Sequence, residues 1–310
     1  MKRSEKVSVL VPSYNEEENI EELLKKFDEV FEKKELNAEL ILVDDGSTDD
    51  TYQRAMEQKE SYPFLRVVRH RTNLGLTEAL KTGFREATGD ILVFYPADLQ
   101  YSPMDMPLLL DKLSEGYDLV TGWKHGDYGL KGVISFFYNV LSRWLFSVEV
   151  HDLNSVKAFK RSVADEITLR KDWHRYFVVL AAELGFRISE VRIPLHPRKH
   201  GKSKFGILRI PIGILDLVSV KFQMLFMKKP MLLFGSIGLL LFLIGIVTGL
   251  YALYMRFVLM QGFRPLLYFV VLSILAGIAF FSFGFLLEVM MTMLEKLESL
   301  ETERKRKRDE

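Results

Sequence analysis

The sequence contains no cysteine, and this absence excludes disulfide bonds, thiolate metal sites and a cysteine nucleophile. Net charge is also nearly absent, because 42 Lys and Arg residues are balanced by 41 Asp and Glu residues. The overall balance therefore gives no reason to expect nucleic acid as a partner. Glycine-rich phosphate loops of the dinucleotide-binding or Walker type are missing as well. Any phosphate chemistry must rest on other groups.

Charged residues are missing from two long stretches in the C-terminal third. The residues from Pro230 to Met255 and from Pro265 to Leu287 include no Asp, Glu, Lys, Arg or His. Each stretch is long enough to cross a bilayer, which takes about 20 residues. The alternative is a pair of core helices in a soluble protein, but such helices rarely lack a polar side. We expect membrane-spanning helices at residues 230–255 and 265–291.

Basic residues flank these two stretches on their outer sides. They are Lys221, Lys228, Lys229, Lys296 and the run at 304–308, whereas the connection between the stretches offers only Arg256 and Arg264. The positive-inside rule then places both termini in the cytoplasm. Residues 292–310 form a basic cytoplasmic tail that either touches anionic lipid or is a solvated terminus. The first apolar run stops at Pro12 and is too short for a signal peptide.

Short apolar runs alternate with helical patterns over the first part of the chain. The apolar runs lie at 7–11, 40–43, 65–68, 91–95 and 119–121, and the helical patterns at 17–33, 49–60, 77–87 and 104–115. This alternation predicts an α/β fold with a mainly parallel sheet and helices on both faces. Ligands in such sheets bind at the carboxyl ends of the strands, so the loops that follow the strands are the candidate site.

Acidic loops follow three of the expected strands. They are 12–16 (PSYNE), 44–49 (DDGSTD) and 96–100 (PADLQ). A single acidic turn is more often a helix cap than a ligand, but three of them would meet at one sheet edge. Asp98 and Gln100 offer hard oxygen donors two residues apart, which suits Mg²⁺ or Mn²⁺ bridged to a diphosphate.

These elements together resemble the polyprenyl-phosphate sugar synthases of glycosyltransferase family 2, which have the GT-A fold. The resemblance covers residues 6 to about 206. It rests on the segments 11–16 (VPSYNE), 43–47 (VDDGS), 73–75 (NLG), 97–100 (ADLQ) and 201–204 (GKSK), and on Asp152 with Ser155.

The resemblance implies a role for each matching residue. The nucleotide of the donor would contact Pro12, Tyr14, Glu16, Val43, Asp45 and Ala97. The catalytic residues would be Asp98, Asp152 and Lys124, with Asp98 and Gln100 as metal ligands. The acceptor phosphate would meet Lys124, Lys131 and Ser135, and the donor diphosphate would meet Arg198 and Lys204.

One position departs from the family pattern of Asp-Ala-Asp, because Pro96 replaces the first aspartate. The metal and sugar site therefore carries one negative charge less. Either the metal binds more weakly, or a neighbour such as Asp44 or Glu16 compensates.

The resemblance thus implies a metal-assisted, inverting enzyme that moves a hexose from a GDP- or UDP-sugar to a polyprenyl phosphate. Transfer to a sugar hydroxyl and non-catalytic binding of a nucleotide-sugar at the membrane are the alternatives. The expected organisation is a GT-A catalytic domain at 1–206, an interfacial amphipathic helix at 207–229 and then the two spans. A core helix is the alternative for 207–229. Self-association through the spans is a further expectation.

Overall fold

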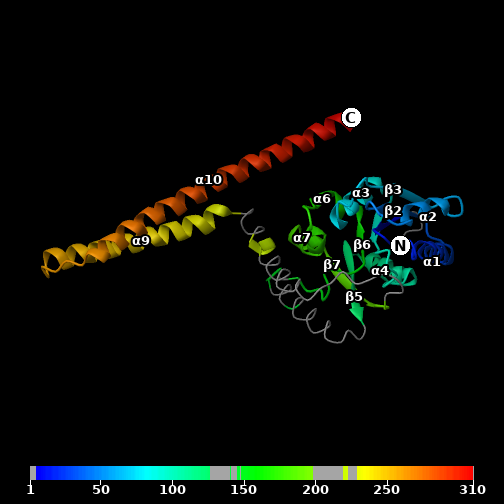
Figure 1. Ribbon diagram of the computed structural model, residues 1–310, viewed down its shortest axis with the longest axis horizontal. Coiled ribbons are helices and arrows are strands. Elements are labelled where there is room, and N and C mark those ends of the chain that lie inside the picture. Colours follow the sequence, from blue (N-terminus) through cyan, green and yellow to red (C-terminus); the bar gives the residue numbers. More distant parts are fainter. Residues whose placement is uncertain are drawn as a thin grey trace. The chain divides into compact units, whose positions relative to one another are not determined.

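The computed structural model describes residues 5–125, 140, 145–146, 148–197, 219–222 and 229–309. The chain divides into two compact units, Met1–Ile210 and Pro211–Glu310. The first unit holds a sheet with helices packed on it, and the second holds two long helices that form a hairpin (Figure 1).

The first unit is built on a seven-stranded sheet within the part of the chain that is described. Its strands are β1 (Val7–Ser13), β2 (Ala38–Asp44), β3 (Leu65–Arg69), β4 (Ile91–Phe94), β5 (Leu119–His125), β6 (Lys157–Lys160) and β7 (Ile188–Pro194). The order is β3-β2-β1-β4-β6-β5-β7. Four neighbouring pairs run parallel, and only β6 runs antiparallel to both of its neighbours, β4 and β5. The expected, mainly parallel α/β fold is confirmed.

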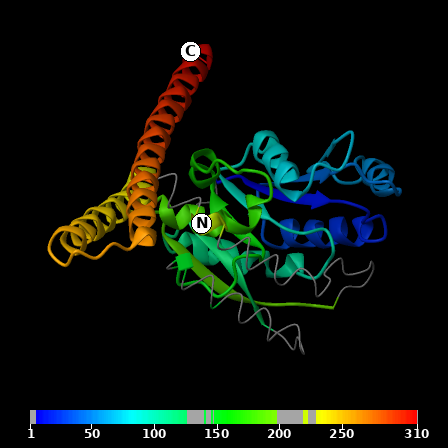
Figure 2. The same ribbon diagram turned by 60° about the vertical axis from the view of Figure 1, so that its left-hand side comes forward.

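Helices cover both faces of this sheet. They are α1 (Ile20–Lys33), α2 (Thr51–Glu57), α3 (Leu76–Glu86), α4 (Met106–Ser114), α6 (Arg161–Glu166) and α7 (Phe177–Glu183), with short 3-10 helices η1 (Pro103–Asp105) and η2 (Trp173–Tyr176). Alternate residues of β1 point to opposite faces. Gly83 of α3 approaches Leu10, so α3 packs on the face opposite to that of Val9, and Figure 2 shows α1 and α3 on the two sides.

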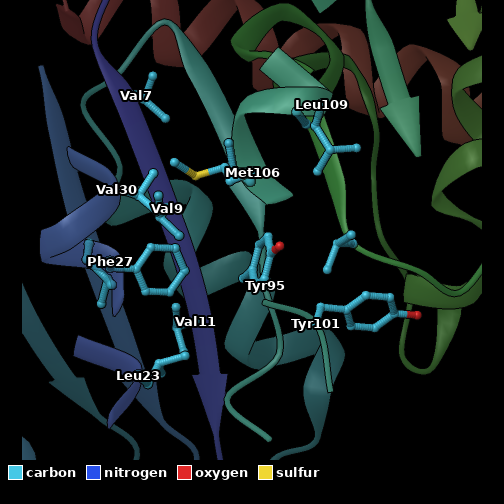
Figure 3. Close-up of a cluster of buried hydrophobic side chains, with 14 of the residues drawn as sticks. Val7, Val9, Val11, Leu23, Phe27, Val30, Tyr95, Tyr101, Met106 and Leu109 are labelled. Carbon is cyan, nitrogen blue, oxygen red and sulfur yellow. The ribbon is translucent and has the colours of Figure 1, made fainter. Parts of the chain in front are cut away.

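The main core lies between α1 and β1. Apolar residues of α1 recur every three or four positions, and Leu23, Phe27 and Val30 of that helix are buried against Val9 and its neighbours (Figure 3). The Phe27 ring meets the buried Tyr95 ring edge to face at 5.5 Å between centroids. This packing fixes the start of the loop that follows β4, and that loop carries Asp98.

Strands β6 and β7 were not among the five strands that the sequence predicts. β6 is only four residues long and contains Lys157 and Lys160, so its apolar pattern is weak. Its position depends on tertiary pairing, since Lys157 lies opposite Phe94 of β4 and Thr121 of β5.

The second unit consists of α9 (Pro230–Phe257) and α10 (Arg264–Asp309). Both are long and apolar enough to cross a membrane. They touch through glycines: a Cβ on Gly238 would meet Phe281 N at 2.6 Å, and one on Gly277 would meet Phe242 N at 2.7 Å. Small residues thus allow the two backbones to approach closely, as is usual for helices that pack in lipid.

Helix α10 is longer than the expected span at 265–291. It continues to Asp309 without a break, through the residues predicted to form a separate tail. Of the predicted interfacial helix at 207–229, the structure describes residues 219–222, which are helical, and Lys229. The rest of that prediction lies outside the described residues.

A partly buried carboxylate joins the amino-terminal edges of the strands. Glu39 Oε1 accepts hydrogen bonds from the Ser8 hydroxyl at 2.6 Å and the Thr88 N–H at 2.7 Å, and Lys6 Nζ lies 3.2 Å from Oε2. Burial alone would raise the pKa of Glu39, but these donors outweigh it and lower the pKa to about 2.

Replacing Glu39 by glutamine should lower the thermal midpoint at neutral pH, because the ionised form is the one that these donors stabilise. A carboxyl group whose folded-state pKa is depressed stabilises the fold above its unfolded pKa, and the effect disappears as pH falls through its folded value. The difference between the parent and Glu39→Gln should therefore shrink between about pH 4.5 and pH 2. Thermal unfolding of the full chain in detergent measures this difference. The exposed Glu29→Gln is the control, and a gap that does not depend on pH contradicts the ionic explanation.

Candidate active site

The carboxyl edges of β1 and β2 bring several of the sequence-predicted residues together. Pro12 of β1 lies directly opposite Val43 of β2 in the parallel register, and Ser13 lies opposite Asp44. The Asp45 N–H then donates to the Ser13 carbonyl at 2.9 Å. Three of the predicted nucleotide contacts, Pro12, Val43 and Asp45, therefore lie at one sheet edge.

The loops after these two strands are joined by hydrogen bonds. The Asn15 N–H donates to Ser47 Oγ at 3.0 Å, and Asn15 Oδ1 accepts from the Thr48 N–H at 2.9 Å. The Glu16 N–H donates to Thr51 Oγ1 at 2.8 Å. Asn15 has a φ of 55°, which asparagine tolerates better than most residues. The two loops thus form one wall, which carries Tyr14 and Glu16.

The Asp45 carboxylate ties a third loop to this wall. Its Oδ1 accepts from His70 Nδ1 at 2.8 Å and from the Leu74 N–H at 2.9 Å, and its Oδ2 accepts from the Gly75 N–H at 2.8 Å. A carboxylate accepts only, so His70 Nδ1 carries the proton. The segment 73–75 that supported the resemblance is thus a partner of Asp45, a contact that sequence reasoning did not assign.

Gly46 allows this close approach. Its φ is +70°, and a Cβ there would meet the Thr72 carbonyl carbon at 2.5 Å and Asn73 N at 2.7 Å. Neither the backbone angle nor the space admits a side chain.

The turn after β4 contains the two predicted metal ligands. Asp98 is buried, Leu99 has a φ of 55°, and Asp98 Oδ1 accepts from the Gln100 N–H at 3.2 Å. One carboxylate and one amide two residues apart fit Mg²⁺ or Mn²⁺, because such ions take few protein ligands and complete their shell with phosphate oxygens and water. Among the described residues no group of three His, Cys, Asp or Glu side chains forms a metal cage. The donor set therefore suits a cation that a diphosphate ligand helps to hold.

The segment after β7 is attached to the same turn. The His196 N–H donates to the Gln100 carbonyl at 2.8 Å. This contact holds the chain beside the turn that contains Asp98 and Gln100, two residues before Arg198. Arg198 itself lies outside the described residues.

The carboxyl end of β5 carries an ion pair. Lys124 Nζ lies 3.1 Å from Asp152 Oδ2, and the Asp152 side chain is 6% exposed. Asp152 Oδ1 also accepts from the Asn154 N–H at 2.9 Å, and the Asp152 carbonyl accepts from Thr121 Oγ1 at 3.2 Å. Two of the predicted catalytic residues, Lys124 and Asp152, are thus direct neighbours.

Aromatic stacking fixes the loop that carries Asp152. The His151 ring stacks on Trp123 with centroids 4.0 Å apart, and His151 Nδ1 is 2.5 Å from Glu190 Oε1. The Arg192 guanidinium lies 4.6 Å from the centre of the Trp123 ring. None of these residues was predicted from the sequence.

Lys157 is a further residue that sequence reasoning missed. It is 4% exposed, and its Nζ donates to the Ser155 carbonyl at 2.6 Å. Burial, followed by the charge of Lys124, lowers its pKa to about 7 against the opposing effect of Asp152. A lysine between the apolar neighbours Val156 and Ala158 is the only sequence signal of this site.

The predicted residues are thus distributed in order along one edge. Residues for the nucleotide lie on β2 and β1, Ala97, Asp98 and Gln100 follow β4, and Lys124 ends the series on β5. The predicted contacts Lys131, Ser135, Arg198 and Lys204 lie outside the described residues. The individual roles of all these residues stay predictions.

A mainly parallel sheet with helices on both faces and acidic turns along its carboxyl edge defines a GT-A-like fold. Solved structures of glucosyl-3-phosphoglycerate synthase from Mycobacterium tuberculosis agree. The structure in complex with Mn²⁺, UDP and phosphoglyceric acid has a TM-score of 0.58 at 22% identity and covers 71% of this chain and 79% of its own. That likeness shows the fold.

The family follows from the sequence comparisons. Residues 8–166 match the family described as glycosyl transferase family 2. The chain is 33% identical over 300 residues to dodecaprenyl-phosphate galacturonate synthase of Rhizobium johnstonii, with 93% of this chain and 88% of that protein covered. It is 28% identical to undecaprenyl-phosphate 4-deoxy-4-formamido-L-arabinose transferase of Pseudomonas syringae, with 93% and 86% covered. Dolichol-phosphate mannosyltransferase of Pyrococcus furiosus is 36% identical over 186 residues, with 59% and 51% covered.

The chain therefore belongs to glycosyl transferase family 2 and is a glycosyltransferase. The Rhizobium and Pseudomonas relatives, which match 93% of it, are named for sugar transfer to polyprenyl phosphates.

Replacing Gly46 by alanine should destabilise the fold by more than about 1 kcal/mol, because the new Cβ meets backbone atoms as well as an unfavourable φ. Nucleotide affinity should also fall, since the loops at 15–16 and 70–75 are held through this point. Unfolding midpoints and calorimetric binding of UDP and GDP measure both effects.

Gly185→Ala is the matched control, because Gly185 has a φ of +85° but no atom lies within 4 Å of the position that a Cβ would take there. Gly185→Ala should lose only the stability that the unfavourable φ accounts for, and it should keep its affinity for nucleotide. Equal losses in the two variants would refute the steric argument at Gly46.

Proposed function

We propose that this protein transfers a hexose from a UDP- or GDP-sugar to the phosphate of a polyprenyl phosphate. One observation carries the proposal: similarity to enzymes named for polyprenyl phosphates covers 93% of the chain, a share that includes the apolar hairpin as well as the sheet. The solved neighbours with a different acceptor in their names match only about 65–71% of the chain.

The donor binds at the carboxyl ends of β1 and β2. Pro12 and Val43 line the edge, Tyr14 and Glu16 extend from the first loop, and Asp45 keeps the wall in place through its hydrogen bonds to the 70–75 loop. A divalent cation held by Asp98 and Gln100 supplies positive charge for the diphosphate that leaves. Arg198 and Lys204 add charge to the same group; the His196 N–H bond to the Gln100 carbonyl, two residues before Arg198, is consistent with this role.

The acceptor is a phosphate monoester with a second pKa of about 6, so it is largely ionised at neutral pH and needs little help from a base. Neutralising negative charge matters more than removing a proton, because an anionic acceptor must approach a donor that is itself anionic. Lys124, with Lys131 and Ser135, binds the acceptor phosphate, and Asp152 orients Lys124. The phosphate oxygen then displaces the nucleoside diphosphate directly, with inversion at the anomeric carbon.

Pro96 in place of the usual first aspartate leaves Asp98 as the carboxylate of this turn. Binding of the metal therefore depends on Asp98 more than it would at a site with two carboxylates, since the Gln100 amide is neutral.

Helices α9 and α10 anchor the enzyme in the membrane, with both termini in the cytoplasm. Their outer surfaces are apolar, and basic residues flank them on the side of the two termini. Anchoring raises the effective concentration of a membrane-bound acceptor at the site.

Membranes that contain the full chain should transfer label from one UDP- or GDP-hexose to polyprenyl phosphate. Chromatography of the lipid extract detects the product. Asp98→Ala should abolish the transfer, and EDTA should abolish it in the parent, whereas the exposed Asp111→Ala should keep it. Transfer to a sugar hydroxyl but to no polyprenyl phosphate would overturn the proposed acceptor, and full activity of Asp98→Ala in EDTA would overturn the metal site.

The absence of native cysteine makes the topology directly measurable. Met260→Cys, in the connection between the helices, should react with a membrane-impermeant maleimide in intact cells. Thr302→Cys should react only after lysis, and the parent chain should not react at all. The reverse pattern would place the termini outside, and equal labelling of both in intact cells would argue against a spanning hairpin.

A further inference from the structure

Lys157 is a buried lysine on the same sheet edge as the predicted catalytic residues. It begins β6, the strand that separates β4, which leads to Asp98, from β5, which leads to Lys124. Because β6 is antiparallel to both neighbours, its first residue lies opposite Phe94, the last residue of β4, and opposite Thr121 of β5, three residues before Lys124. Its Nζ lies 5.5 Å from the centre of the Phe94 ring and donates to the Ser155 carbonyl. The fold thus holds this ammonium group in one place.

Three charged or titratable groups surround this lysine. Asp152 attracts the ammonium, and Lys124 repels it. His174 of η2 is affected by Lys157 in turn: burial, then Arg175 and Lys157, lower the pKa of His174 to about 4, so His174 is neutral at pH 7. His174 Nδ1 lies 2.9 Å from Thr77 Oγ1. The Asp152 carboxylate therefore interacts electrostatically with two lysines, and of these Lys124 forms the direct ion pair at 3.1 Å.

The two lysines differ in what they can do. Lys124 is 27% exposed and already pairs with Asp152, so it can turn toward a ligand. Lys157 is buried and bonded to the backbone, so it cannot. If Lys124 leaves Asp152 for an acceptor phosphate, a carboxylate with 6% exposure loses its ion-pair partner. An unpaired buried charge is strongly unfavourable.

We propose that Lys157 is a positioning residue for sugar transfer: it supplies the countercharge for Asp152 while Lys124 binds the acceptor phosphate. This inference rests on the proposed function. Lys157 touches neither substrate. It lowers the free-energy cost of separating Lys124 from Asp152, and so it strengthens binding of the acceptor and not of the donor.

Lys157 changes its protonation when Lys124 leaves Asp152 for the acceptor phosphate. Near neutral pH only part of the molecules carry a protonated Lys157. Once Lys124 moves away from Asp152, its repulsion of Lys157 weakens while the attraction of Asp152 remains, so the pKa of Lys157 rises. Lys157 then takes up a proton from the solvent. Binding of an already dianionic phosphate at pH 8 should therefore be accompanied by proton uptake.

The test compares Lys157→Met with the parent, both as full chains in detergent. Calorimetry with a short prenyl phosphate measures the Kd of the acceptor, and assays give the donor KM. The variant should bind the prenyl phosphate roughly tenfold more weakly or worse, within the usual range for coupled sites. The donor KM and the thermal midpoint should stay unchanged, because removing a buried and incompletely paired charge does not weaken the core. A lower midpoint with parallel losses for donor and acceptor would assign Lys157 a structural role and overturn the proposal.

Lys160→Met is the matched control. Lys160 lies at the other end of the same strand, pairs with Asp118 at 2.8 Å and is 43% exposed. It should leave acceptor binding unchanged. Equal weakening in the Lys160 and Lys157 variants would show a general effect of charge and contradict the proposal.

A double-mutant cycle isolates the link to Asp152. With Asp152→Asn present there is no carboxylate to balance, so adding Lys157→Met should change the Kd by less than about twofold. A full tenfold effect in that background would overturn the proposal. Calorimetry at pH 8 in buffers of different ionisation enthalpy should show proton uptake in the parent and none in Lys157→Met.

Failure of the proposed function gives a different result. In that case the parent itself neither binds the prenyl phosphate nor transfers sugar to polyprenyl phosphate. A parent that does both, with a Lys157→Met variant that binds the acceptor equally well, refutes only the inference about Lys157.

Discussion

Buried charge is the constraint on which the rest of this site depends. Asp44, Asp45, Asp98, Asp152 and Lys157 are all buried along one edge of one sheet. Each such group is stable only if the fold supplies partners for it. The loops around the site are therefore arranged to donate hydrogen bonds and opposite charges to these side chains, and the site is organised before any ligand arrives.

The partners come from segments that are distant in the sequence. Asp44 Oδ2 lies 3.0 Å from Arg69 Nε without good hydrogen-bond alignment, so this contact is ionic. Asp45 binds the loop at 70–75, and Asp152 binds Lys124. In the proposed reaction a nucleotide-sugar would meet the hydrogen-bonded loops on the side of β1 and β2. On the side of β5 it meets an ion pair with one partly exposed member, which suits a second, anionic substrate.

The order of the strands determines the order in which the predicted binding residues lie along the sheet edge. The residues predicted to bind the nucleotide, the metal and the acceptor follow one another from β2 to β5, and the antiparallel strand β6 lies between the last two strands. Had β6 run parallel, Lys160 and not Lys157 would lie at the carboxyl edge. The apolar hairpin adds the remaining requirement for a lipid acceptor, and its glycine contacts explain how two helices with mostly apolar outer surfaces pack closely together.

Local pattern alone was enough to predict much of this protein. Alternation of apolar runs and helical stretches predicts the parallel sheet, and the polar loops at 12–16, 44–49 and 96–100 follow the strands as expected. The two charge-free stretches predict the long helices. These features depend on residues that are close in sequence, where periodicity and turn chemistry decide the structure.

Only the tertiary structure decided the pairings. Strand β6 has too few residues and too many lysines to be read from its sequence, and its place between β4 and β5 depends on contacts across more than 30 residues. The partners of Asp45, the stacking of His151 on Trp123 and the burial of Lys157 likewise join distant segments. A sequence shows that a lysine or an aspartate is present, but whether it is buried, and which charge it faces, depends on how the chain folds back on itself.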